Sequence, residues 1–165
     1  MKITQLIPIL ITLFVCTKNS YSQNNIVLDS EKKAFIYHLI WKNERLDNPD
    51  CFARKVSKLC GPWLEIDLKV DDRKVKSIAL RVQACALGQS SAAILYKNII
   101  NAEFKEVIAA RNSLVLMLNG SDGCFPPRFS ELELLRGVSE YPARHASTLL
   151  AFNAAVEALK NTNLE

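Results

Sequence analysis

Two cysteines and one histidine stand at places where one predicted element gives way to the next, and they are the residues best suited to chemistry. Cys85 directly follows a strand pattern and directly precedes a helix pattern. The unpaired amide groups and the positive dipole end of a helix N-terminus favour a thiolate, which can bind a metal ion or accept sulfur. The alternative is that Cys85 is a small, buried hydrophobic residue. The sequence pattern by itself leaves both interpretations open.

Cys60 and His145 offer two further donors. Cys60 precedes Gly61 at the start of a predicted hairpin, so it would project from the end of the sheet, where it can meet Cys85 at one rim. His145 lies in the first turn of the last predicted helix and carries a nitrogen that can bind a metal ion, although a solvated histidine is the other interpretation. The five cysteines are an odd number without a CxxC pair, which predicts neither a disulfide framework nor a zinc finger.

The elements that position these residues follow from hydrophobic periodicity. Apolar residues alternate with polar ones over 64–70 and again over 78–84, with a polar turn at 71–74, which predicts an antiparallel hairpin. Helical spacing of apolar residues predicts helices over 30–41, after Cys85, and over 102–118, 131–135 and 142–160. This order predicts an α+β fold, in which a small antiparallel sheet of about three strands is covered on one face by helices.

Length and composition predict one compact domain. The chain has 165 residues, of which 49% are hydrophobic, and its net charge of +4 is spread without a basic run, so nucleic acid is not expected as a partner. Residues 1–22 combine Lys2, a short apolar run and small residues near Ser22, the pattern of a signal peptide. The run is too short to span a membrane, so membrane contact is expected only through this segment, if it is not cleaved.

Three sequence blocks resemble those of a known family. The blocks are LCGPWLEIDLKVDD, VQACALGQSSA and GVSEYPARHASTLLAF, and they lie in this order on the predicted hairpin, the strand-to-helix junction and the last helix. Together they resemble the signature regions of iron-sulfur cluster assembly scaffolds of the IscU, SufU and NifU N-terminal type, over residues 31–160. The resemblance implies the α+β fold of that family and a scaffold function, so the chain is not expected to be an enzyme.

The resemblance also implies a ligand set. In that family a cysteine in a CGD motif, a second cysteine before a helix and a His-Cys pair opening the last helix bind a [2Fe-2S] cluster or zinc. Cys60, Cys85 and His145 match three of these positions, and they are the predicted cofactor-binding and metal-binding residues. Pro62 stands where the family has the aspartate, and Ala146 stands where it has the third cysteine.

Three ligands can hold zinc with a water molecule in the fourth place, whereas an iron-sulfur cluster generally requires four donors. Several groups could complete the set. They are Cys51, Cys124, an external thiol, or the second subunit of a homodimer that pairs Cys60 and Cys85 of both subunits. The sequence does not choose between them.

The function that the resemblance implies is a scaffold or carrier for iron or a labile [2Fe-2S] cluster. A cysteine desulfurase would supply the sulfur and apo-proteins would accept the cluster. Two alternatives stay open: a zinc-binding accessory that relays sulfur from the desulfurase, and a degenerate domain retained for protein interactions. The family implies a cytoplasmic location. The signal-peptide pattern instead implies export to the periplasm, where a disulfide between Cys60 and Cys85 would replace metal chemistry.

Overall fold

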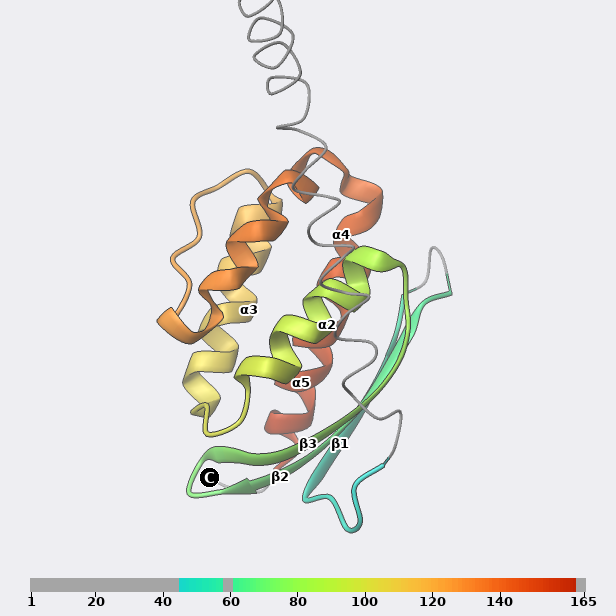
Figure 1. Cartoon of the computed structure of the whole chain (residues 1–165), viewed down its shortest axis with the longest axis vertical. Coiled ribbons are helices and arrows are strands. Elements are labelled where there is room, and N and C mark those ends of the chain that lie inside the picture. The colour runs from blue at the N-terminus through green and yellow to red at the C-terminus, as the bar shows by residue number, and fades with distance from the viewer. Residues whose placement is uncertain (1–44, 58–60, 163–165) are drawn as a thin grey trace, which may run out of the picture.

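The computed structural model describes residues 45–57 and 61–162, which form a sheet with helices packed against it (Figure 1). The signal-peptide pattern of residues 1–22, the predicted helix 30–41 and Cys60 lie outside the described residues. Among the residues that are described, no helix is long and apolar enough to cross a membrane.

The sheet is antiparallel and has three strands in the order β1-β2-β3. Its outer strand β1 pairs with β2 along its whole length, from Cys51 opposite Leu68 to Val56 opposite Trp63. The predicted hairpin is confirmed as β2 and β3, which are joined by a turn with Asp72 and Arg73. The bounds of the strands are β1 Cys51–Val56, β2 Trp63–Asp71 and β3 Lys74–Gln83.

The alternating pattern of β2 gives the sheet a core face and an outer face. Leu64, Ile66 and Leu68 point into the core and are completely buried. Asp67 belongs to the other face, yet it is also buried, because the Arg45 guanidinium forms a bidentate ion pair with its carboxylate at 2.9 Å for both contacts. The backbone amide of Leu46 donates a third hydrogen bond to this carboxylate.

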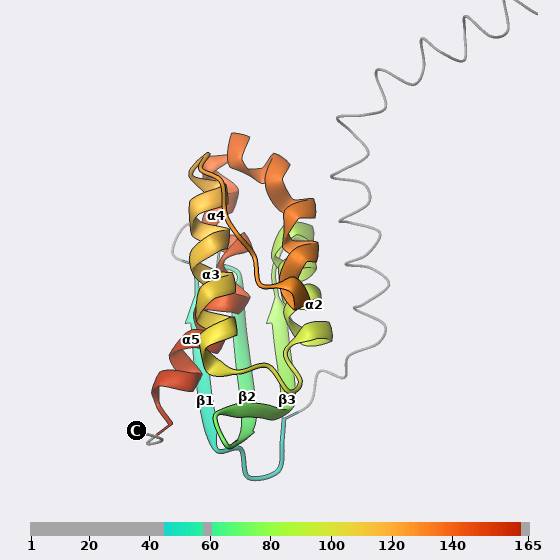
Figure 2. The same ribbon diagram turned by 90° about the vertical axis from the view of Figure 1, so that its left-hand side faces the viewer.

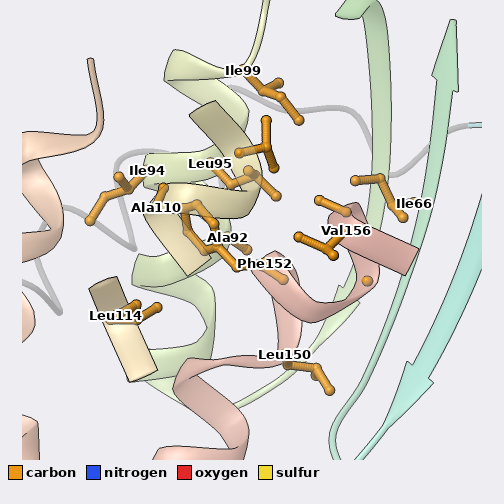
Figure 3. Packing of buried hydrophobic residues seen from close by; sticks show 14 of the residues in the cluster. Ile66, Ala92, Ile94, Leu95, Ile99, Ala110, Leu114, Leu150, Phe152 and Val156 are labelled. Carbon is orange, nitrogen blue, oxygen red and sulfur yellow. The ribbon is translucent and has the colours of Figure 1, made fainter. Parts of the chain in front are cut away.

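The helices lie on the core face of the sheet, so the predicted α+β fold is confirmed (Figures 1 and 2). Helix α5 packs directly on β1 and β2, while α2 contacts β3 and α5, and α3 packs against α5. In the core, Phe152 and Val156 of α5 lie between Ile66 of the sheet and Leu95 of α2 (Figure 3). The helices are α2 Ala86–Asn98, α3 Phe104–Leu118, the 3-10 helix η1 Pro127–Glu140, α4 Pro142–Thr148 and α5 Leu150–Lys160.

Two of the predicted helices differ in detail. The short helix expected at 131–135 is a 14-residue 3-10 segment, η1, whose Phe129 packs edge-to-face on Phe152 with ring centroids 5.6 Å apart. The helix expected at 142–160 begins at Pro142 as predicted but is interrupted at Leu149. The Thr148 hydroxyl donates back to the carbonyl oxygen of Arg144, a bond that bends helices. Leu149 thus separates the short helix α4 from α5.

Candidate functional site

Cys85 occupies the position that the sequence predicts for it, between the end of β3 and the start of α2. It is the N-cap residue of α2, with an extended backbone (φ −65°, ψ 168°), and it is half-buried. Because the first amide groups of a helix have no partner within the helix, they point toward the N-cap side chain. The thiol therefore lies near the backbone amides of Leu87 and Gly88.

The partners of the Cys85 thiol come from two helices. Ser147 of α4 places its hydroxyl 3.2 Å from the sulfur atom. Burial by itself would raise the pKa of Cys85. The hydrogen bond of Ser147, the amides of Gly88 and Leu87 and the positive charge of Arg144 outweigh burial, so the pKa of Cys85 is lower than that of an ordinary thiol. The environment favours a thiolate.

Cys85 lines a cleft of about 210 Å³. Gly61 and Pro62, from the start of the hairpin, form one side of this cleft, and Arg144 and Ser147 of α4 form the other. Among the described residues, the start of the hairpin therefore lies beside the Cys85 junction. Cys60 precedes Gly61 directly but lies outside the described residues, so its own approach to Cys85 stays a prediction.

The close approach of α2 and α4 at this cleft depends on a glycine. A Cβ atom at Gly88 would lie 2.7 Å from Ser147 Oγ, 3.0 Å from the Ser147 carbonyl oxygen and 2.9 Å from Ala84 Cβ. Real Cβ atoms do not come this close to other atoms. Gly88 therefore allows Ser147 to reach Cys85.

The side chains of the two positions that follow Arg144 do not line the cleft. The Nε2 atom of His145 donates a hydrogen bond to the carbonyl oxygen of Val138 at 3.1 Å and lies 3.3 Å from that of Ser139. Ala146 lines a separate, neighbouring groove. The structure thus joins Cys85 with Ser147, two positions beyond His145, and a ligand role for His145 stays a prediction.

Sequence reasoning missed Ser147 and Arg144 as members of the site. In the sequence, only their spacing points to the site. Arg144 and Ser147 are three residues apart and therefore share one face of a helix, just before the apolar stripe of the last predicted helix. Among residues 45–57 and 61–162, no group of three or more His, Cys, Asp and Glu side chains could hold a metal ion. The described part of the cleft thus offers one thiol, whose pKa is lowered by Ser147, two backbone amides and Arg144.

The other two described cysteines lie elsewhere. Cys51 is buried on the core face of β1, and its burial, with the nearby charge of Asp50, raises its pKa to about 11. Cys124 is exposed in the loop after α3, where Ser113 donates to its carbonyl oxygen at 2.6 Å. Neither cysteine lines the cleft of Cys85.

No family model matches the sequence. Two curated proteins, both named iron-sulfur cluster assembly scaffold protein IscU, are similar to it. The one from Streptococcus pyogenes serotype M1 is 28% identical over 103 residues, which are 62% of this chain. The one from Thermotoga maritima is 26% identical over 116 residues, which are 70% of this chain and 81% of that protein. The chain spans 65% of the length of the Streptococcus protein.

A solved structure extends the likeness to nearly a whole domain. The crystal structure of a nitrogen-fixing NifU-like protein (N-terminal) from Brucella abortus is 34% identical, with a TM-score of 0.74. The match covers 81% of this chain and 95% of that one. The chain belongs to the iron-sulfur cluster assembly scaffold family of the IscU, SufU and NifU N-terminal type. The predicted family is thereby confirmed.

This scaffold domain has a further structural relative, which supports the fold alone. It is a proposed SUF-system scaffold protein from Fervidobacterium islandicum AW-1, 19% identical, with a TM-score of 0.69 over 81% of this chain and 93% of that one. Members of the family are scaffolds and not enzymes, in agreement with the expectation from the sequence.

Proposed function

We propose that this scaffold domain, over residues 31–160, binds iron or a labile [2Fe-2S] cluster as its cargo and transfers it to apo-protein acceptors. The observation that supports the proposal is the thiol of Cys85, which lies at a helix N-terminus in an open cleft and has a lowered pKa. A thiolate is the form that binds iron and that accepts sulfur.

The proposed ligands are Cys60, Cys85 and His145, which match three of the family positions. Pro62 and Ala146 occupy the two positions that have lost their ligands, so the chain by itself provides three donors and the cargo needs a fourth. A second subunit or an external thiol would supply it. A cargo held partly by an external group is easy to release, which suits a protein that hands its cluster on.

The proposed partners follow from the family. A cysteine desulfurase would deliver sulfur, and apo-proteins would receive the assembled cluster. The chemistry needs reduced thiols, so we propose that the domain acts in the cytoplasm. Export through residues 1–22 is the alternative, and a reporter that matures only after export, fused to residues 1–30, decides between the two locations.

A second candidate function is sulfur relay with zinc or without metal. It is favoured by the described cleft, where one activated thiol is surrounded by the donors of Ser147, Arg144 and two backbone amides. In such a relay the Cys85 thiolate attacks the outer sulfur of a donor persulfide. A persulfide forms on Cys85 and the donor thiolate leaves, so one sulfur atom moves without net oxidation.

The test is the iron, zinc and acid-labile sulfide content of protein purified without oxygen, together with its visible spectrum. Cys60→Ser, Cys85→Ser and His145→Ala are compared with Cys124→Ser, a control at an exposed thiol outside the cleft. Iron and sulfide that disappear in the three variants but not in the control support the scaffold. Zinc alone, or a persulfide on Cys85 alone, supports the relay, and none of these in any form contradicts both functions.

A further inference from the structure

A second concave surface lies beside the Cys85 cleft, and its charge is mainly positive. It is a groove of about 460 Å³ between β1, α3 and the last two helices. Leu150 and Val156 contribute apolar surface to it, whereas Lys55, Arg111 and Lys160 contribute three positive charges. Glu157 is the only acidic residue among the described residues that line the groove.

Only one of the three cations has a carboxylate partner among the described residues. Lys55 forms an ion pair with Glu157, whereas Arg111 and Lys160 have no ion pair with any described residue. The Nε atom of Arg111 is shielded from solvent and lacks a hydrogen-bond acceptor within the described part of the chain. The guanidinium donates one hydrogen bond, to the side-chain oxygen of Asn112 at 3.1 Å, and its charge is not balanced by a described carboxylate, so an acidic group in the groove would pair with the charge of Arg111.

The end of the outer strand, with Lys55 and Val56, forms part of the groove lining. Strand β1 pairs with β2 on one edge, and no described strand pairs with its second edge (Figure 2). Val56, which also lines the groove, is 55% exposed. An extended chain can add to such an edge through main-chain hydrogen bonds, and alternate side chains then point the same way.

The groove adjoins the Cys85 cleft. Ser57 lines both concave surfaces, and neighbouring residues of α4 separate them, with Ala146 facing the groove and Ser147 facing Cys85. A protein segment bound in the groove would therefore hold the rest of its protein next to the thiol. This is the placement that a sulfur donor or a cluster acceptor requires.

We propose that the groove between β1, α3 and α5 docks an extended acidic segment of a partner protein, beside the strand edge and over Arg111 and Lys160. The docked segment lies along β1 with its carboxylates toward the cations. That the partner exchanges sulfur or cluster with Cys85 rests on the proposed function, whereas the docking itself does not.

The test uses a fluorescein-labelled peptide in which glutamate alternates with valine, with a lysine-valine peptide as the charge control. In an extended peptide this alternation puts every glutamate on one face. Fluorescence anisotropy with the full chain should show binding of the glutamate peptide only, weakened by added salt. Lys160→Glu and Arg111→Glu should each weaken it at least about tenfold, since each reverses a charge that the peptide meets.

Lys76→Glu is the matched control, because Lys76 is a similarly exposed lysine on β3 that does not line the groove. Lys160 is exposed, so its variant keeps the test valid even if Arg111→Glu disturbs folding. Equal affinity of the Lys160→Glu and Lys76→Glu variants would overturn the proposal, as would a lack of binding. A dimer in sedimentation that Lys160→Glu abolishes would overturn it too, because a second copy would then occupy the groove.

Cys85→Ser separates this proposal from the proposed function. Retained peptide affinity in Cys85→Ser supports docking, because the groove does not contain the thiol. If the purified protein holds no metal, sulfide or persulfide but still binds the peptide, the docking proposal is supported and the proposed function of the cleft is contradicted. If the protein holds cargo but does not bind the peptide, only the docking proposal is contradicted.

Discussion

Cys51 lies on the core-facing side of strand β1, whereas Cys85 stands at the N-terminus of helix α2, and the two thiols have shifted pKa values of opposite sign. Burial raises the pKa of Cys51 to about 11. Cys85 is also desolvated, which opposes ionisation, but Ser147, two backbone amides and Arg144 stabilise its thiolate and lower its pKa.

The comparison shows that donors, rather than burial alone, decide which cysteine is reactive. The neighbours of Cys51 in the core are apolar, such as Ala53 and Leu68, and they offer nothing to a negative charge. The N-cap position of Cys85 brings it amide groups whether or not other residues assist. Cys51 is thus a structural thiol and Cys85 a reactive one, and each of the following experiments tests this difference.

The largest expected effect is in alkylation. At neutral pH, Cys85 should react with iodoacetamide more than about 100-fold faster than Cys51, because their thiolate fractions differ by at least this factor and burial shields Cys51. Mass spectrometry of the two peptides over time gives both rates. The exposed Cys124 serves as the reference for an accessible thiol. Similar rates at Cys51 and Cys85 would abolish the distinction.

The next effect is in stability at high pH. The raised pKa of Cys51 means that the buried neutral thiol contributes fully below pH about 9, the unfolded value, and that its contribution is lost as the pH rises toward about 11. The loss should reach about 2–3 kcal/mol in the free energy of unfolding. Urea titrations across this range measure it. In Cys51→Ala, the free energy of unfolding should not show this part of the decrease at high pH. An equal decrease in the wild-type protein and in Cys51→Ala would contradict the burial of a neutral thiol at position 51.

A smaller effect is expected from packing beside Cys85. Gly88→Ala should destabilise the protein by about 1–3 kcal/mol, because the new Cβ would collide with Ser147, although alanine normally favours a helix over glycine. Ser91→Ala in the same helix is the matched control. Its buried hydroxyl has no hydrogen-bond partner among the described residues, so its removal should be neutral or stabilising. Urea midpoints that shift alike for both variants would show that α2 and α4 do not pack this closely.

The smallest effect concerns the hydrogen bond to the thiolate. Ser147→Ala should raise the pKa of Cys85, since the hydroxyl 3.2 Å from its sulfur no longer donates. The alkylation rate of Cys85 at neutral pH should fall several-fold, and its pH profile should move to higher pH. The rate of Cys51 in the same sample should stay constant. An unchanged profile would assign the activation of Cys85 to the backbone amides and Arg144 alone.

Much of the fold could be predicted because its patterns are local. Alternating side chains predict the hairpin of β2 and β3, and the change of period after Cys85 predicts the start of α2. The break at Leu149 was not predicted, because the apolar stripe continues through this position, and the Thr148 bond to the Arg144 carbonyl, a kind of bond that can bend a helix, is seen only in the structure. The extent of η1 was also missed, and this segment packs on α2 and α3, which are distant from it in the sequence.

The sequence by itself determined the family, the order of the elements and the place of Cys85 at a helix N-terminus, because each depends on neighbouring residues along the chain. Only the tertiary structure decided which distant residues meet Cys85. Ser147 lies 62 positions away, and it reaches the thiol because Gly88 lets α4 approach α2. The joining of Lys55, Arg111 and Lys160 in one groove has the same origin, since it depends on how β1, α3 and α5 pack and not on any spacing in the sequence.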